Sequence, residues 1–492
     1  MERLPTELLL QIAAQLDGPT LVTDLTNLAL ASRRLKGVAQ DALYVAPIVE
    51  YRRCRRWDDD PTLEPSILLA RTMVEQPSLA RKMKRLAFKI FNDTSDFKRF
   101  MDLPNSPRRS PVDSEDLDVA QLVRGIDADR RGACLEFAPP LEALELLVVN
   151  RQDIDAPRLP SVDLFDFDLE TTRPKFPAFT KLRSLTTNCP VPWIMISLPT
   201  LKSLNLRITT ESDPYYDIPS TPGQLKLTSL VVSVDRDILI EDWQLGNTAQ
   251  SVLAYFTQLM SQARALEDLS IRVTCRWPCH FHDQVEKSWD YVASRIPRLD
   301  NLRTLEIDAA EIRVDRIKDE EHMNKIEWSL RIRAAPIVSL ERFRNLERLT
   351  IPEMALLGDS RIPQGDNKII CHLPHTLKSI SIIDSTKMLA QWAKDVWNHR
   401  SNFPALSGIT LWCDRKSQPL EPLTSIDAEE SASFENQLEL GATLAETLMG
   451  YPGTAWDALS DSGIELVAHG RSERLRWRRL QDESRFKLPP EI

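Results

Sequence analysis

Apolar residues return at intervals of three and four positions within the first 45 residues, a spacing that predicts short helices. The first helix spans residues 6–16: Pro5 and Thr6 favour its start, and Asp17-Gly18-Pro19 ends it. A second helix follows over residues 21–29, and Ser32 can cap a third. Because roughly 40 residues rarely bury enough apolar surface to fold alone, these helices should pack against a partner or against the rest of the chain.

A different pattern begins at Leu141, where Leu-x-x-Leu-x-Leu or a close variant keeps returning. Its clear copies start at Leu141, Leu182, Leu201, Leu227, Leu266, Leu302, Leu346, Leu377 and Leu406, with a weaker copy at residues 162–167. The spacing is irregular, from 19 residues between Leu185 and Leu204 to 44 between Leu305 and Leu349. The period-2 residues of each copy predict a short strand with one inward face. One such unit cannot bury its face alone, so the units should stack into a solenoid.

The N-terminal helical segment resembles an F-box. The matching residues are Leu4-Pro5-x-Glu7-Leu8-Leu9, Ile12, Leu16, Leu28-x-Leu30-Ala31-Ser32-Arg33-Arg34-Leu35 and Ala39-x-Asp41-x-Leu43-Tyr44. Leu35 and Tyr44 lie near positions where the family usually carries Trp, so this chain keeps an apolar side chain there. The resemblance implies binding to the small acidic adaptor of Skp–cullin–F-box ubiquitin ligases. An amphipathic three-helix cap without an adaptor is the alternative.

The resemblance also implies which side chains contact the adaptor. They are Leu4, Pro5, Glu7, Leu8, Ile12, Leu16, Leu28, Leu30, Leu35, Leu43 and Tyr44. The last five would be shared between the internal core of the helices and the contact. In the competing interpretation, all these residues pack only within the chain.

The repeated pattern resembles leucine-rich repeats, and an F-box followed by divergent leucine-rich repeats is a family architecture with many fungal examples. We therefore expect an α/β fold in four parts. These are a three-helix F-box (1–48), a helical linker with an exposed Pro/Ser-rich loop at 92–118 (49–135), an irregular leucine-rich-repeat solenoid (136–415) and a helical C-terminal cap (416–492). An open sheet of parallel strands uses the same alternation of strand and helix and remains an alternative.

Composition narrows the compartment and the partners. A formal net charge of -10 disfavours a non-specific nucleic-acid binder, because contact with phosphates needs a cationic face. The 7 cysteines are scattered and odd in number, which fits a reducing interior. We find no signal peptide and no run of 18 apolar residues, so we expect no membrane association and a cytoplasmic or nuclear location.

One cluster carries metal-ligand residue types, at Cys275-x-x-x-Cys279-His280-x-His282. Thiolates and imidazoles suit zinc, but this spacing fits no established zinc motif, so we predict a metal-free loop and no cofactor. A metal-dependent enzyme centred on this cluster is the alternative. The sequence contains no nucleophile elbow, phosphate-binding loop or dinucleotide fingerprint, and we therefore predict a non-catalytic protein.

Two further groups concern recognition and its regulation. Ser106-Pro107 and Ser110-Pro111 flank two arginines, so phosphate there could order the exposed loop. Solvent-facing positions beside repeat strands are predicted for four arginines that could bind substrate or could be ordinary solvated charges: Arg207, Arg272, Arg303 and Arg348.

These features together predict a substrate-recognition subunit of a Skp–cullin–F-box-type ligase. Its partners would be the adaptor, through it a cullin and a RING subunit, and an unknown protein substrate bound by the repeat domain. The alternative is a non-catalytic leucine-rich-repeat scaffold that acts outside the ligase.

Overall fold

The structure is a computed structural model of the 492-residue chain. It describes residues 8–9, 13, 21–52, 65–93, 140–151, 167–168, 173–174, 179–188, 191, 193–208, 224–235, 252–274, 293, 296–308, 337, 339–357, 373–383, 385, 389–413 and 455–470. The chain forms two compact units, Met1–Pro219 and Ser220–Ile492. The division between them falls inside the span that the sequence assigns to a single repeat domain.

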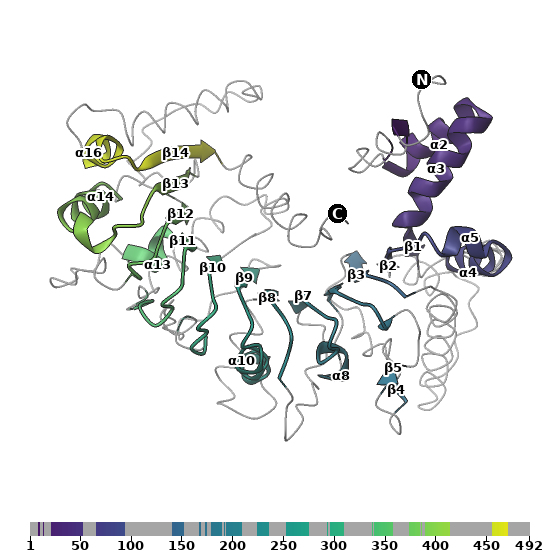
Figure 1. Ribbon diagram of the computed structural model, residues 1–492, viewed down its shortest axis with the longest axis horizontal. Helices are drawn as coiled ribbons and strands as arrows, with labels where there is room; N and C mark the ends of the chain where they lie inside the picture. Colours follow the sequence, from purple (N-terminus) through teal and green to yellow (C-terminus); the bar gives the residue numbers. More distant parts are fainter. Residues whose placement is uncertain are drawn as a thin grey trace, which may run out of the picture. The chain divides into compact units, whose positions relative to one another are not determined.

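The first unit begins with packed helices, α2 (Leu21–Ala31) and α3 (Arg33–Val45) (Figure 1). Ser32 caps α3 as the sequence predicts, because its hydroxyl accepts a hydrogen bond from the Leu35 amide at 3.2 Å. Of the predicted first helix, Leu8, Leu9 and Ala13 are described, and all three are helical. The buried core of this helical region consists of Leu9, Ala13, Leu25, Leu35, Val38 and Ala39.

Parallel strands follow in the first unit, in the order β1-β2-β3-β6-β7. Their bounds are Ile48–Arg52, Arg85–Asp93, Ala143–Arg151, Ser184–Thr187 and Ser203–Ile208. The accompanying helices are α4 (Pro65–Glu75), α5 (Pro77–Ala80) and α8 (Trp193–Ile196). A separate antiparallel pair joins β4 (Phe167–Asp168) to β5 (Arg173–Pro174).

The second unit contains consecutive parallel strands, in the order β8-β9-β10-β11-β12-β13-β14, which Figure 1 shows side by side. Their bounds are Ser229–Asp235, Asp268–Thr274, Thr304–Asp308, Arg348–Pro352, Ser379–Ile383, Gly408–Cys413 and Glu465–Gly470. Its described helices are α10 (Val252–Gln262), α13 (Glu353–Leu357), α14 (Leu389–Asn398), α16 (Ala455–Asp461) and a 3-10 turn, η4 (Arg400–Asn402).

The repeated leucines explain why these strands form. Each clear copy of the pattern leads into one strand: the first copy leads into β3, and the later copies lead into β6 to β13 in order. The apolar residues of the copies are buried, as Leu302, Leu305 and Ile307 illustrate. The amide of the first Leu closes a tight turn, as in Leu302 N–H to Leu299 C=O at 3.3 Å. The pattern therefore specifies both the turn and the inward face of the strand that follows.

Adjacent turns are joined to one another by a recurring hydrogen-bond arrangement. The carbonyl after the first Leu accepts two successive amides from the next turn: Arg303 C=O accepts from Glu347 N–H at 2.8 Å and from Arg348 N–H at 2.9 Å. Glu347 C=O repeats this with Lys378 and Ser379 at 2.7 and 3.0 Å. This arrangement fixes the register of neighbouring strands, as expected for an open α/β sheet built from stacked units.

Three local predictions need correction. The predicted helical linker (49–135) contains strands β1 and β2 as well as helices. The chain enters β2 through Met83-x-x-Leu86-x-Phe88, a copy of the pattern in which Met replaces the first Leu. Leu86 and Phe88 lie in β2, and all three side chains are buried. The weaker copy at 162–167 is not a repeat strand in its described part, because Phe167 pairs in antiparallel fashion with Pro174.

The third correction concerns residues 465–470, which the sequence places in a helical cap. They form β14, parallel to β13. The chain enters β14 from α16 through Gly463, whose φ of 85° reverses the chain direction. The amides of Gly463 and Ile464 bond back to Ser460 C=O and Leu459 C=O at 2.9 and 3.2 Å. This helix-ending turn takes the place of the leucine turn, so the repeat pattern could not reveal the strand.

Candidate functional site

The N-terminal helices bury one apolar face and leave other apolar side chains exposed. Leu35 lies in the core of α2 and α3, with Leu28 and Leu43 partly buried against it. Leu8 is 44% exposed and Leu30 is 80% exposed. Two single exposed leucines do not by themselves mark a binding surface, so their meaning depends on the family to which the segment belongs.

The predicted adaptor-contact residues therefore divide into three groups. Leu8 and Leu30 are exposed, whereas Leu28, Leu35, Leu43 and Tyr44 are buried to different degrees. The others lie outside the described residues: Leu4, Pro5, Glu7, Ile12 and Leu16. Contact with the adaptor stays a prediction for all eleven residues. Leu35 is buried in the core of the helices.

A short connection attaches these helices to the first sheet. Only Ala46 and Pro47 separate α3 from β1. The amide of Lys84, in the turn before β2, donates to Val45 C=O at 3.0 Å, and Lys82 Nζ lies 2.5 Å from Asp41 Oδ2 on α3. The helical region and the first strands are thus joined by backbone and side-chain bonds.

The four arginines proposed to bind substrate do not form one exposed strip. Arg272 on β9 is only 6% exposed, and its guanidinium pairs with both carboxylate oxygens of Glu306 on β10 at 3.2 Å. Glu306 is 2% exposed and also accepts a hydrogen bond from the Ser270 hydroxyl at 2.7 Å. The prediction that Arg272 faces solvent is wrong, because the second face of these strands is buried as well as the first. We call Ser270, Arg272 and Glu306 the buried ionic cluster.

Arg303 lies in the turn before β10 and Arg348 is the first residue of β11, and both side chains are exposed and paired. Arg303 Nη1 is 4.0 Å from Glu347 Oε1, and Arg348 Nη2 is 3.8 Å from Asp268 Oδ1. The side chain of Arg207 lies outside the described residues. A substrate-binding role for Arg207, Arg303 and Arg348 stays a prediction.

A row of alternating charge runs along the turns of the second unit. Glu267, Arg303, Glu347 and Lys378 each follow the first Leu of a copy, and Lys378 Nζ lies 3.1 Å from Glu347 Oε1. The hydrogen bond from Lys378 lowers the pKa of Glu347 below its ordinary value, with additional attraction from Arg303 and Arg348. We call these four residues the turn charge row.

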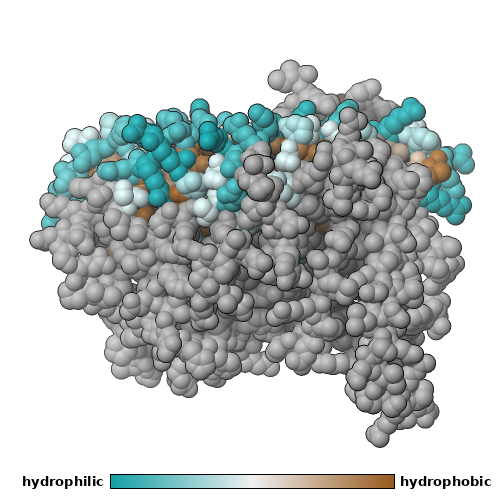
Figure 2. All heavy atoms as spheres, turned by 90° about the horizontal axis from the view of Figure 1, so that it is seen from below, coloured by the Kyte–Doolittle hydropathy of each residue, from teal (hydrophilic) through white to brown (hydrophobic). Residues whose placement is uncertain are grey.

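The sequence contained a signal for this row, because the charges alternate at one fixed position of the repeat. Figure 2 shows one side of the molecule, on which hydrophilic residues cover most of the described surface and apolar residues appear in small areas between them.

The described residues contain neither a cluster of metal-ligand side chains nor a helix that could span a membrane. Within those residues, no group of three or more His, Cys, Asp or Glu side chains is placed to hold a metal ion. Cys275, Cys279, His280 and His282 lie outside them, as do Ser106 and Ser110. No helix in the described part of the chain is both long and apolar enough to cross a membrane.

Comparison with known families supports the resemblance of the N-terminal segment. Residues 1–47 match the family model described as F-box-like. F-box domains bind Skp-type adaptors in Skp–cullin–F-box ligases and are typically non-catalytic. No curated protein matches the chain. The chain therefore carries an F-box-like domain at its N-terminal end, and the matched residues contain both exposed leucines.

Proposed function

We propose that this protein is the substrate-recognition subunit of a Skp–cullin–F-box-type ubiquitin ligase. The observation that carries the proposal is the F-box-like match over residues 1–47, in which α2 and α3 form a buried core and leave Leu8 and Leu30 exposed. These two leucines would bury against the adaptor, and a cullin and a RING subunit would be reached through it.

The remaining chain would act as a divergent leucine-rich-repeat domain that binds a protein substrate. Repeated buried leucines, parallel strands and the recurring turn hydrogen bonds support the repeat architecture in this proposal. Such a subunit needs no catalytic residue, because it speeds ubiquitin transfer by holding the substrate near the charged conjugating enzyme. It would work in the cytoplasm or the nucleus.

Co-expression with a Skp-type adaptor followed by pull-down tests the adaptor contact. The double variant Leu8→Asp/Leu30→Asp should lose binding, because two carboxylates would be buried in an apolar contact. Val74→Asp is the matched control, since Val74 is 55% exposed on α4 and lies outside the F-box-like residues. Equal retention of adaptor by the wild type and the double variant would contradict the proposal.

Assembly of a full ligase is a separate question. A cullin that co-purifies with the wild-type chain and adaptor, and is absent with Leu8→Asp/Leu30→Asp, would support the ligase. Adaptor binding without cullin would favour the scaffold that acts outside the ligase.

A further inference from the structure

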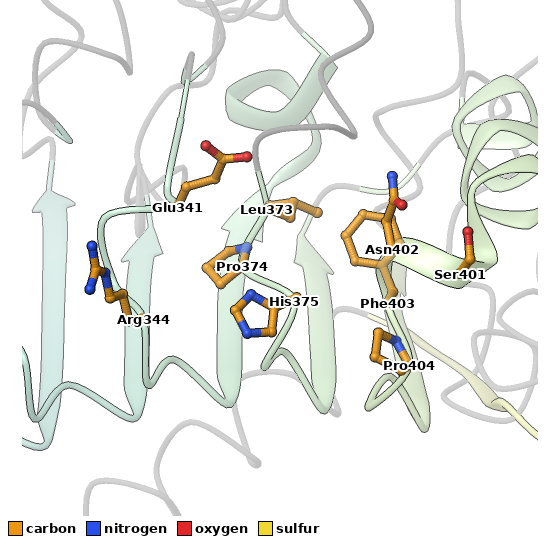
Figure 3. Close-up of a pocket in the computed structure, with 9 residues that line it drawn as sticks. All are labelled: Glu341, Arg344, Leu373, Pro374, His375, Ser401, Asn402, Phe403 and Pro404. Atoms are coloured by element: carbon orange, nitrogen blue, oxygen red, sulfur yellow. The ribbon is translucent and has the colours of Figure 1, made fainter.

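An open pocket of about 420 Å³ lies on the turns that precede β11, β12 and β13 in the second unit (Figure 3). Its lining holds one arginine, Arg344, and one glutamate, Glu341, and Phe403 is almost fully buried. The pocket therefore has no excess charge and no exposed aromatic ring that would select a partner. The carboxyl ends of the same strands carry stronger features.

The second face of β10 to β13, opposite the repeat leucines, is buried at the carboxyl ends of these strands. Alternation along each strand places Asp308, Pro352, Ile383 and Trp412 on this face, and we call them the carboxyl-end row. The register pairs Pro352 with Ile383 and Ile383 with Trp412. Asp308 and Ile383 are 1% exposed, Trp412 is 3% exposed, and Pro352 is buried. Because the structure contains a single chain, a segment of this same chain must cover the row.

The buried charges on this face are unequal in sign. Arg272 pairs with Glu306, and the register also places Arg272 opposite Asp308. All three residues are at most 6% exposed, so two carboxylates and one guanidinium are buried together. Burying a charge costs free energy unless an opposite charge and hydrogen bonds offset that cost. A covering segment that brings a further cation together with apolar side chains would therefore suit this face.

The chain leaves the sheet beside the carboxyl-end row. His469 on β14 lies opposite Trp412, and the two ring centroids are 4.6 Å apart in a stacked arrangement. Strand β14 ends at Gly470, and residues 471–492, which lie outside the described residues, follow it. Four strand spacings of about 4.8 Å separate β14 from β10, a distance that about six extended residues can span. The chain near Arg476 can therefore reach β10.

The sequence at this distance from β14 has the composition that the face requires. Residues 474–480 read Arg-Leu-Arg-Trp-Arg-Arg-Leu, so four arginines are interspersed with three apolar residues. Leu475, Trp477 and Leu480 can pack on the apolar members of the row. The long arginine side chains can extend past them, and a guanidinium forms strong hydrogen bonds with a carboxylate.

We propose that residues 474–480 bind across the second face of β10 to β13. At least one arginine would pair with Glu306 or Asp308, and the apolar residues would cover the rest of the carboxyl-end row. The binding of this segment does not depend on the adaptor contact. One consequence rests on the proposed function: a substrate that uses this face of the repeat domain has to displace the segment first.

Photocrosslinking in the full-length chain tests this inference. Benzoylphenylalanine replaces Trp477, the protein is irradiated, and mass spectrometry identifies the linked peptides. The links should fall in β10, β11, β12 or β13. Arg474→Glu/Arg476→Glu should lower their yield at least about tenfold, because it brings new carboxylates to a face that already holds Glu306 and Asp308.

Arg485→Glu/Lys487→Glu is the matched control for charge. It reverses two charges that follow residues 474–480 in the same C-terminal segment, and it should keep the yield within about twofold of the wild type. A labelled peptide of residues 474–480 gives a second measurement. The variant Arg474→Glu/Arg476→Glu should bind it at least about tenfold more tightly than the wild type, in which the attached segment already occupies the face.

Three results would overturn the inference: links that miss β10 to β13 and lie instead in α16 and β14, an equal loss of yield in both double variants, or equal peptide binding by the wild type and Arg474→Glu/Arg476→Glu. Adaptor pull-down is scored separately on the same proteins. A chain that binds adaptor but lacks the expected links contradicts only this inference. A chain that shows the links but ignores the adaptor contradicts only the proposed ligase function.

Discussion

The buried ionic cluster and the turn charge row use the same residue types in opposite surroundings. In the cluster, Arg272 and Glu306 are almost fully buried, and Ser270 provides a further hydrogen bond. In the row, the Lys378 side chain is 56% exposed and that of Glu347 is 31% exposed, with one close contact between them. The comparison shows that a charged residue beside a repeat strand can be part of the buried interior or of the solvated surface. Its position in the repeat alone does not decide which.

The energetic consequences of the two settings differ accordingly. Removing a charge from water costs several kcal/mol for each ion, so a buried pair is stable only while both partners are present. An exposed pair competes with water and salt, and it contributes about 0–1 kcal/mol. Replacing one partner should therefore lower the free energy of unfolding much more in the buried ionic cluster than in the turn charge row.

The largest effect is expected for Arg272→Met. This change leaves the Glu306 carboxylate buried without its cation and should lower the free energy of unfolding by about 3–5 kcal/mol. Urea denaturation of the full chain measures it as a shift of the midpoint. A loss below about 0.5 kcal/mol would mean that Arg272 is solvated, and the contrast between the two ionic sites would disappear.

A smaller effect is expected when both partners of the buried pair are replaced. Arg272→Met/Glu306→Leu leaves no unpaired carboxylate, so the double variant should regain about 1–3 kcal/mol over Arg272→Met alone. The same denaturation experiment gives this coupling energy. Additive losses from the two substitutions would show that the pair does not interact as the structure indicates.

Breaking the exposed pair should matter much less. Lys378→Ala should reduce the free energy of unfolding by about 0.2–1 kcal/mol at low ionic strength, and the difference should shrink in 1 M salt, where the Debye length is about 3 Å. Urea midpoints at the two salt concentrations provide the measurement. A loss as large as that of Arg272→Met would show that the row is not solvated.

The smallest effect is the pH dependence of Glu347. Because its pKa is lower in the folded chain, its contribution to stability is complete above the pKa of the unfolded chain and is lost as pH falls through the folded value. In Lys378→Ala, NMR titration should show the pKa of Glu347 rising toward its ordinary value. Arg264→Ala serves as the control and should leave that titration unchanged.

The sequence predicted the strands well because the signal for them is local. A Leu three residues before a period-2 pair sets the turn and the inward face together, as Leu302, Leu305 and Ile307 illustrate. The pattern did not predict strand β2, because Met83 replaces the first leucine. It did not predict β14, because a turn that ends a helix at Gly463 replaces the leucine turn. In β2 the inward residues Leu86 and Phe88 are buried, whereas the described side chains of β14 are exposed or only partly buried and the buried Ile464 lies just before the strand.

The candidate site was predictable only in part. The F-box-like motif lies within one short segment, so its residues could be found without knowing the fold. Whether Leu30 or Leu35 is exposed depends on how α2 and α3 pack, and a linear pattern does not contain that information. Burial of Arg272 depends on what covers the second face of the strands, which period-2 alternation cannot reveal.

The hydrogen bonds between turns also limit where the chain can accept inserted residues. In turns such as those of Arg303 and Glu347, one carbonyl accepts two amides of the next turn, so an extra residue there would break contacts with both adjacent repeats. The spacing between the copies that begin with Leu nevertheless varies from 19 to 44 residues. Insertions must therefore have accumulated on the segments that leave the strands. A reporter or tag should be tolerated on those segments and should disrupt the protein at the turns.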